Sequence, residues 1–144
     1  MIAEGESDGL EFKSTLRWDL KEGKESKKLE EVVIKTVAAF ANSNGGTLLL
    51  GVDDEGHILG LDHDYLSLGE ANRDKFERHL RNLLNHQFGV AFVTTKVQIR
   101  FHQIEDRELC EIETSQAKEP AIVKVTDKNG QASEKFYVRS GNSS

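Results

Sequence analysis

The sequence predicts one α+β domain, with a mixed, largely antiparallel sheet and two main helices packed on it. Two long segments carry apolar residues at helical spacing, and about six to eight shorter segments show the alternation or apolar runs typical of strands. The last third of the chain is the richest in such strand patterns. With 144 residues, of which 37% are hydrophobic and 31% charged, the chain is long enough to bury one core.

The first part of the chain predicts a short strand, a charged loop and a long helix. Residues 9–13 have a strand-like pattern, whereas residues 17–28 are rich in charge and indicate a loop. From Leu29 the apolar residues recur at helical spacing, and Ser26 is the expected N-cap. We expect the helix to end at Asn44-Gly45-Gly46, because these residues tolerate positive φ.

A buried strand and a second helix are predicted next. Residues 47–52 form an apolar run that indicates a strand buried on both faces. The acidic turn at 53–56 and the segment 57–61 predict a β-hairpin with this strand. Ser67, with Glu70 three residues later, has the capping-box pattern, so we expect the second helix to begin there.

The last third of the chain predicts several strands. The strand patterns cover residues 93–101, 110–113, 121–125 and 136–139, with a turn signal at 127–130. The last four residues are polar and contain no closing element. We therefore expect residues 1–144 to form a single domain that belongs to a longer protein.

Composition excludes several classes of protein. Cys110 is the single cysteine, so an internal disulfide and a cysteine-rich zinc site are excluded, and a small buried side chain is its better interpretation. The five histidines lack the HxxxH or HExxH spacing of a metal site. No basic segment followed by an apolar one opens the chain, and no apolar run approaches the length of a membrane span. We expect a reduced, cytoplasmic protein without a membrane partner.

The glycine pattern argues against a P-loop and hence against ATP as a ligand. A P-loop needs spaced glycines followed by Lys and Ser or Thr at the start of a helix. Gly45-Gly46 instead ends a predicted helix and leads into a strand, and no Lys-Ser/Thr pair follows Gly9. The GxGxxG pattern of dinucleotide-binding proteins does not occur either.

The charge pattern leaves room for a local nucleic-acid site. A net charge of −6 argues against a uniformly basic surface, since non-specific nucleic-acid binding draws mainly on positive charge. The candidate phosphate contacts are Lys13, Arg17, Lys24 and Arg139; for Arg139 the alternative is a cross-strand ion pair. Trp18 either stacks on a base or anchors its loop to the core.

Carboxylates provide a second candidate site. Glu6 and Glu11 flank the first predicted strand, and Asp53 and Asp54 follow the buried strand, where side chains are exposed yet rigidly placed. Three carboxylates that meet in space can hold Mg²⁺ or Mn²⁺, and such an ion polarises a phosphodiester. The alternative is an acidic turn that is simply solvated.

Three motifs span nearly the whole chain. They are ESDGLEFKS at residues 6–14, AAFANSNGGTLLLGVDD at 38–54 and YVRSGNS at 137–143. In this order and spacing they closely resemble the Schlafen-type AlbA-like domain family. The resemblance implies an α+β fold. Part of the central motif has a structural reason of its own, because Phe40 and the alanines pack the helix and residues 42–46 let the chain reverse.

The same resemblance implies a nucleic-acid-binding module. Bacterial members of the family are often labelled transcriptional regulators or divergent ATP-binding proteins. In animal Schlafens a related core cleaves structured RNA such as tRNA with three metal-binding carboxylates. These correspond here to Glu6, Glu11 and Asp54, which would be catalytic and would bind Mg²⁺ or Mn²⁺, with Lys13 as the neighbouring basic group.

This chain also departs from the Schlafen pattern. The Schlafen nuclease core has two such lobes and a Cys/His zinc finger, whereas this chain has one lobe and one cysteine. A homodimer would supply the second lobe. We therefore expect a DNA- or RNA-binding domain of a transcriptional regulator, with three alternatives: a metal-dependent endoribonuclease, an ATP-binding module, or a dimerisation module without catalysis.

Overall fold

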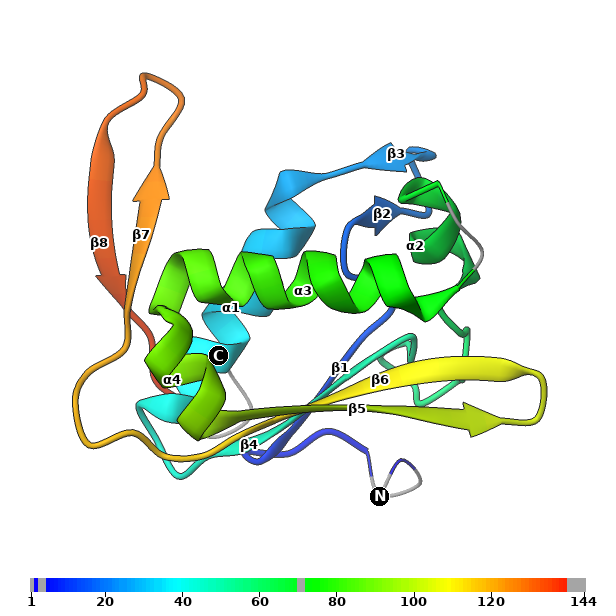
Figure 1. Cartoon of the computed structure of the whole chain (residues 1–144), viewed down its shortest axis with the longest axis horizontal. Coiled ribbons are helices and arrows are strands. Elements are labelled where there is room, and N and C mark those ends of the chain that lie inside the picture. The colour runs from blue at the N-terminus through cyan, green and yellow to red at the C-terminus, as the bar shows by residue number, and fades with distance from the viewer. Residues whose placement is uncertain (1, 3–4, 70–71, 140–144) are drawn as a thin grey trace.

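A four-stranded sheet forms the centre of the domain (Figure 1). The computed structural model describes residues 2, 5–69 and 72–139. β1 (Leu10–Lys13) runs parallel to β4 (Gly46–Leu50), and β6 (Arg107–Thr114) pairs antiparallel with both β4 and β5 (Val97–Ile104). The strand order is β1-β4-β6-β5, so the sheet is mixed and largely antiparallel, as the sequence predicts.

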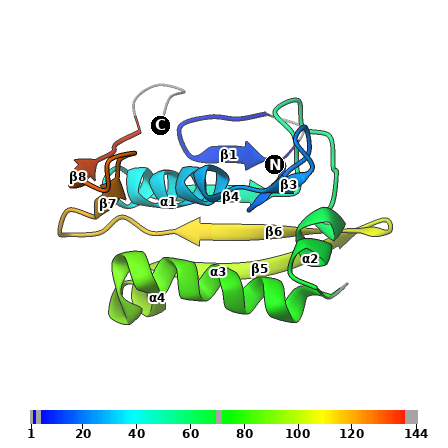
Figure 2. The same ribbon diagram turned by 90° about the horizontal axis from the view of Figure 1, so that it is seen from above.

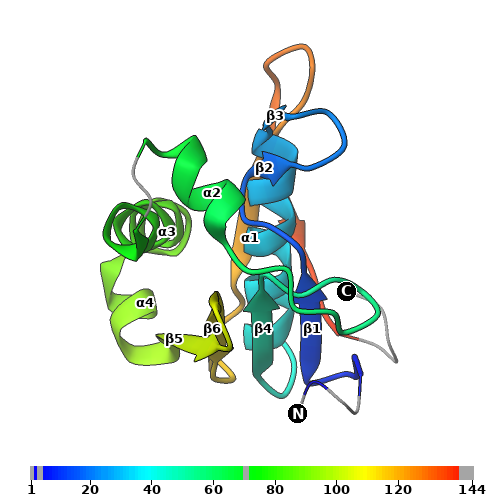
Figure 3. The same cartoon turned by 90° about the vertical axis from the view of Figure 1, so that its right-hand side faces the viewer.

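Two long helices cover one face of this sheet (Figures 2 and 3). α1 (Lys27–Ala41) packs on β4 and β6, and α3 (Arg73–Phe88) lies on the β5 side. The short α2 (Asp62–Ser67) precedes α3, and α4 (Val90–Lys96) follows it. None of the helices in the described ranges combines the length and apolar character that a membrane crossing requires.

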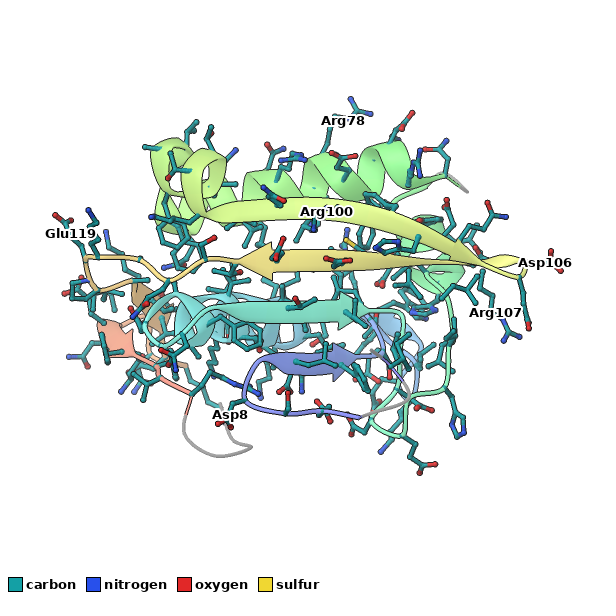
Figure 4. The ribbon with its side chains drawn as sticks, turned by 90° about the horizontal axis from the view of Figure 1, so that it is seen from below. Asp8, Arg78, Arg100, Asp106, Arg107 and Glu119 are labelled. Carbon is teal, nitrogen blue, oxygen red and sulfur yellow. The ribbon has the colours of Figure 1, made fainter. Side chains whose placement is uncertain are left out.

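The opposite face of the sheet, turned to the viewer in Figure 4, is not covered by any described helix. Along β5 and part of β6 this face is polar, and Arg100 there pairs with Glu111 at 2.9 Å and Glu113 at 3.0 Å. The smaller of two apolar clusters lies on the same face, with Phe12 of β1, Leu49 of β4 and Leu109 of β6 buried in it. Polar and apolar side chains thus meet on β6.

β4 is buried on both faces, which confirms the prediction from its apolar run. Leu48 and Leu50 point into the larger core beneath the helices, whereas Leu49 belongs to the smaller cluster on the other face. This alternation follows from the two-residue period of a strand. Cys110 of β6, directly opposite Leu50, is fully buried in the larger core, in agreement with its interpretation as a small apolar side chain.

Two short hairpins extend from this framework. β2 (Trp18–Asp19) and β3 (Lys24–Glu25) form one, within the segment that the sequence analysis assigned to a loop. β7 (Ile122–Thr126) and β8 (Ala132–Phe136) form the other, and it pairs with no strand of the central sheet. The turn predicted at 127–130 connects β7 to β8.

Two predictions for residues 57–70 are wrong. The segment 57–61 contributes only a single bridge, between Val52 and Ile58, because β4 already has β1 and β6 as its two neighbours. Ser67 is the last residue of α2 rather than a cap, and the cap of α3 is Asn72, whose side chain accepts from the amide of Asp74 at 3.0 Å. Glu70 lies outside the described residues.

The strand predicted from Val93 is also partly wrong, because residues 90–96 form α4 and β5 begins at Val97. Val93 is buried in the larger core from a helix instead of a strand. Short apolar runs fit a helix and a strand equally well, and only the packing of α4 against α3 and β5 separates the two here.

The turn from α1 into β4 requires glycine at two positions. Gly45 has a φ of +79°, a conformation that L side chains rarely adopt. Gly46 faces the ring of Phe40, and a Cβ at this position would lie 2.4 Å from two ring atoms. The ring therefore occupies the space that any other residue at position 46 would need.

We expect Gly46→Ala to lower the free energy of unfolding by about 1–3 kcal/mol, because the new methyl group overpacks the Phe40 ring. Urea unfolding followed by circular dichroism measures this change. Gly9→Ala is the matched control, since a Cβ at Gly9 would meet no atom within 4 Å. Equal stability of the two variants would contradict the steric role of Gly46.

Candidate functional site

The side chain of Arg139 is buried against the N-terminal segment and the end of α1. It is 2% exposed, and its Nη1 donates to Glu11 Oε1 at 2.8 Å. Its Nε donates to the carbonyl of Asp8 at 3.0 Å and its Nη2 to that of Ser7 at 2.6 Å. The guanidinium also lies over the ring of Phe40, 4.8 Å from the ring centre, in cation–π contact. We call this set of contacts the Arg139 clamp.

The end of α1 anchors the same C-terminal segment. The Asn42 amide donates to the carbonyls of Ala121 and Tyr137 at 2.9 Å each, and its oxygen accepts from the Ala121 amide at 2.7 Å. Ser43 Oγ accepts from the Arg139 amide at 2.8 Å. The central motif therefore also fastens the chain on either side of the β7–β8 hairpin, a role that its helix-to-strand position alone does not reveal.

The three predicted carboxylates lie near one another but have different partners. Glu6 Oε2 accepts from the amide of Phe12 at 3.0 Å, where β1 forms an edge of the sheet. Glu11 is buried and contacts Lys13 Nζ at 3.2 Å as well as Arg139. Asp54 is exposed in the turn after β4.

Asp53 is the residue that shapes this turn. Its Oδ1 accepts from the amides of Glu55 at 2.9 Å and His57 at 2.8 Å, and its Oδ2 lies 3.0 Å from His57 Nδ1. The hydrogen bond from the His57 amide is the largest cause of the lowered pKa of Asp53. Asp53 therefore has a structural role, and Asp54 stays free to face solvent.

The pKa values of Glu6 and Glu11 are shifted in opposite directions. Burial raises the pKa of Glu6, and repulsion from Glu11 and Asp54 adds to the rise, against the opposing effects of the Phe12 amide and Lys13. Burial alone would also raise the pKa of Glu11, but the hydrogen bond from Arg139 and the charge of Lys13 lower it. Glu11 is thus held as an anion, whereas the charge on Glu6 is destabilised.

The partners of Glu6 and Glu11 oppose a three-acid metal centre. Both oxygens of Glu11 are bound by cationic side chains, and one oxygen of Glu6 is bound by a backbone amide. Among residues 2, 5–69 and 72–139, no group of three or more His, Cys, Asp or Glu side chains is placed to hold a metal ion. An ion shared by Glu6, Glu11 and Asp54 would have to share the oxygens of Glu11 with Arg139 and Lys13.

The four predicted phosphate contacts also differ in their surroundings. Lys13 and Arg139 both pair with Glu11, and Arg17 contacts Glu25. The Arg139 side chain thus forms an internal ion pair, but not the cross-strand pair considered for it, because β8 ends at Phe136 and the strand predicted over 136–139 does not continue to Arg139. Lys24 is exposed and forms no ion pair with any described residue. Of the four cations, Lys24 is therefore the most accessible to an external phosphate.

Asp64 of α2, which the sequence analysis did not single out, organises the loop that leads to β2. It is fully buried and accepts from Thr15 Oγ1 at 2.6 Å and from the amides of Leu16, Arg17 and Trp18 at 2.8 to 3.0 Å. Consecutive amides that converge on one anion form a nest. The local pattern Asp62-His63-Asp64 resembles a solvated acidic turn, so no sequence signal marks Asp64 as buried.

A hollow of about 620 Å³ lies between the β2–β3 hairpin and α2, which are neighbours in Figure 1. Trp18 lines it but belongs to neither of the two core clusters formed by the described residues. The anchoring role considered for Trp18 is thus not apparent in the packing. The hairpin supplies Trp18, Gly23, Lys24 and Glu25, and α2 supplies His63, Leu66 and Ser67.

Because the pKa of Glu6 is raised, we expect the protein to become more stable when the charge of this side chain is removed. A group whose pKa is higher in the folded chain contributes stability at low pH, and this contribution is lost as the pH rises through its folded pKa. We expect Glu6→Gln to raise the free energy of unfolding at pH 7 and to have a smaller effect well below pH 4.5, the ordinary pKa. The Gln oxygen can still accept from Phe12.

Urea unfolding across this pH range measures the effect, with Glu119→Gln as the control at an exposed site far from the cluster (Figure 4). A Glu6→Gln variant that is less stable than the parent at pH 7 would contradict the repulsion described for this cluster.

The fold is shared with two solved structures. One is the N-terminal domain of a RecG-related protein from Nitrosomonas europaea, with a TM-score of 0.57 and 23% identity, covering 98% of this chain and 83% of that one. The other is the DIP2311 protein from Corynebacterium diphtheriae, with a TM-score of 0.52 and 19% identity, covering 90% of this chain and 22% of that one. At these identities the likeness concerns the fold alone.

No curated protein sequence matches the chain. The family model described as Schlafen, AlbA_2 matches residues 6–144, a range that includes all three sequence motifs, the Arg139 clamp and the hollow. The chain therefore belongs to the Schlafen, AlbA_2 family.

Proposed function

We propose that this domain binds nucleic acid and that residues 17–28 provide the main contacts with phosphate. Four exposed lysines on the β2–β3 hairpin and the first turn of α1 are the main observation in support of this proposal. Phosphate contacts from such side chains supply most of the affinity of non-specific nucleic-acid binding. The four are Lys21, Lys24, Lys27 and Lys28.

Two of the acids in this segment are engaged by the protein itself. The Asp19 carboxylate accepts from the amides of Lys21 at 2.9 Å and Glu22 at 3.0 Å. Glu25 contacts the guanidinium of Arg17. Glu22 is exposed and offsets one of the lysines. The segment thus presents local positive charge on a chain whose net charge is −6, which favours a small, defined contact over a broad basic surface.

Membership of the Schlafen, AlbA_2 family supports a role connected with nucleic acid. The similar domain from Nitrosomonas europaea belongs to a protein named for its relation to the ATP-dependent DNA helicase RecG, which points the same way. We propose that the domain serves as the nucleic-acid-binding module of a transcriptional regulator in the cytoplasm.

We expect binding of a fluorescent oligonucleotide to weaken steeply with salt. Replacing Lys24 with Gln should lower the slope of log K against log salt by about 0.7 to 0.9, the value for one lost phosphate contact. Fluorescence anisotropy at several salt concentrations measures this slope.

Lys128→Gln is the matched control, because it removes the same charge at the turn of the β7–β8 hairpin. Equal slopes for Lys24→Gln and the parent would reject the hairpin as the contact surface. No binding of any oligonucleotide at low salt would reject the function.

A metal-dependent endoribonuclease is the second candidate, and the mutual repulsion of Glu6, Glu11 and Asp54 is the observation that favours it. The Arg139 clamp opposes it, since the clamp occupies Glu11. If the candidate is correct, tRNA incubated with Mn²⁺ should be cleaved, and Asp54→Asn should abolish cleavage. Asp54 is the cleaner position for this test because it is exposed, whereas a change at Glu11 also removes the clamp.

Asp106→Asn, at the exposed β5–β6 turn, is the control for this experiment (Figure 4). Gel analysis of the RNA gives the readout. Cleavage that survives Asp54→Asn would reject the carboxylate site.

A further inference from the structure

We infer that the hollow between the β2–β3 hairpin and α2 receives an unpaired nucleobase, stacked on Trp18, with the adjoining phosphate near Lys24. This inference rests on the proposed function and makes it more specific: the preferred ligand is single-stranded or locally unpaired nucleic acid.

Trp18 forms a preformed platform at the wall of the hollow. Trp18 is half-buried, and Asp64 Oδ1 and Thr15 Oγ1 both accept from its amide at 3.0 Å. Its backbone is therefore held in place before any ligand arrives, which lowers the entropy lost on binding. An aromatic side chain outside the core and at the wall of a hollow is suited to stacking, because every base has a π-face.

The walls of the hollow combine apolar and charged side chains. Leu66 of α2 is 65% exposed and gives the hollow an apolar surface beside Trp18. Lys24 places an unpaired ammonium group at the same hollow. The carboxylate of Glu25 also lines the hollow, and its charge is paired with Arg17. An apolar wall, an aromatic face and one cation match a planar base joined to a phosphate, whereas a free phosphate would require more cationic or amide donors than the hollow contains.

The hollow is also lined by two side chains that can accept hydrogen bonds. His63 Nε2 donates to the carbonyl of Ser14 at 3.1 Å, which fixes its proton and leaves Nδ1 of a neutral ring as an acceptor. Ser67 Oγ donates to the carbonyl of Asp64 at 2.7 Å, so its lone pairs remain as acceptors. The exocyclic amino groups of bases are donors that suit such acceptors.

A base inside a duplex cannot enter this hollow without leaving its stack, because a neighbouring base pair covers the face that would stack on Trp18. Unstacking a base from a duplex costs a few kcal/mol, and an unpaired base avoids most of this cost. The site should therefore discriminate by strandedness more than by sequence, since stacking tolerates any base.

The test uses the intrinsic fluorescence of Trp18, which is the single tryptophan of the chain. The protein is titrated with a 12-nucleotide single strand, as DNA and as RNA, and with the corresponding duplex. We expect the single strand to quench the emission and to bind more tightly than the duplex. Trp18→Leu, assayed by anisotropy, should weaken single-strand binding by about tenfold, as expected for the loss of one base–aromatic stack.

Leu66→Glu is a second variant that tests the same hollow without changing the Trp18 platform. Leu66 is largely exposed, so the fold should tolerate the change, while the new carboxylate would repel a phosphate-linked base. Phe136→Leu is the matched control, because Phe136 is an aromatic residue that is 54% exposed on β8 and lies outside the hollow. It should bind the single strand as the parent does.

The outcomes separate the inference from the function on which it rests. Weaker binding by Trp18→Leu and Leu66→Glu, with Phe136→Leu unchanged, would support the nucleobase site. Unchanged single-strand binding by both variants, or equal binding of duplex and single strand, would overturn the inference, and the proposed function would stand if Lys24→Gln still weakened binding. No binding by the parent protein would overturn both.

Discussion

The buried guanidinium of Arg139 joins parts of the chain that are far apart in sequence. It binds the carboxylate of Glu11, 128 positions earlier, as well as the carbonyls of Ser7 and Asp8 and the ring of Phe40. A charged group is stable in such a place only when its charge is paired and its donors are satisfied. These contacts meet both conditions, so the N-terminal segment, the end of α1 and the C-terminal segment depend on one another.

The clamp explains why three separated sequence motifs occur together in one chain. Glu11 belongs to the first motif, Phe40 and Ser43 to the second and Arg139 to the third, and all four meet at one place. It also divides the acidic residues by role. Glu6 satisfies an edge amide of β1, Glu11 is the counter-ion of the clamp, and Asp54 faces solvent. The three acids lie near one another in the fold, but their partners and their exposure differ.

The spacing of apolar residues along the chain is sufficient to predict the helices and strands whose burial follows a regular local pattern. Leu29 to Phe40 follow the helical period, and the apolar run at 48–50 predicts a strand buried on both faces, as the structure shows. Prediction failed where tertiary contacts decide, as at Val93, which is buried from a helix because α3 and β5 enclose it. The roles of Asp64 and Asn42 escaped prediction for the same reason, since their partners lie 46 or more positions away. No local pattern records such pairings.

The coupling between Glu11 and Arg139 tests this account most directly. A double-mutant cycle compares the urea unfolding of the parent, Glu11→Gln, Arg139→Gln and the double variant. If the clamp holds the fold together, each single change removes the charge that faces the remaining partner in the clamp. The double variant should then be less destabilised than the sum of the two single variants by about 1 kcal/mol or more. Additive effects, within about 0.3–0.5 kcal/mol, would show that the two side chains contribute independently and would contradict the account.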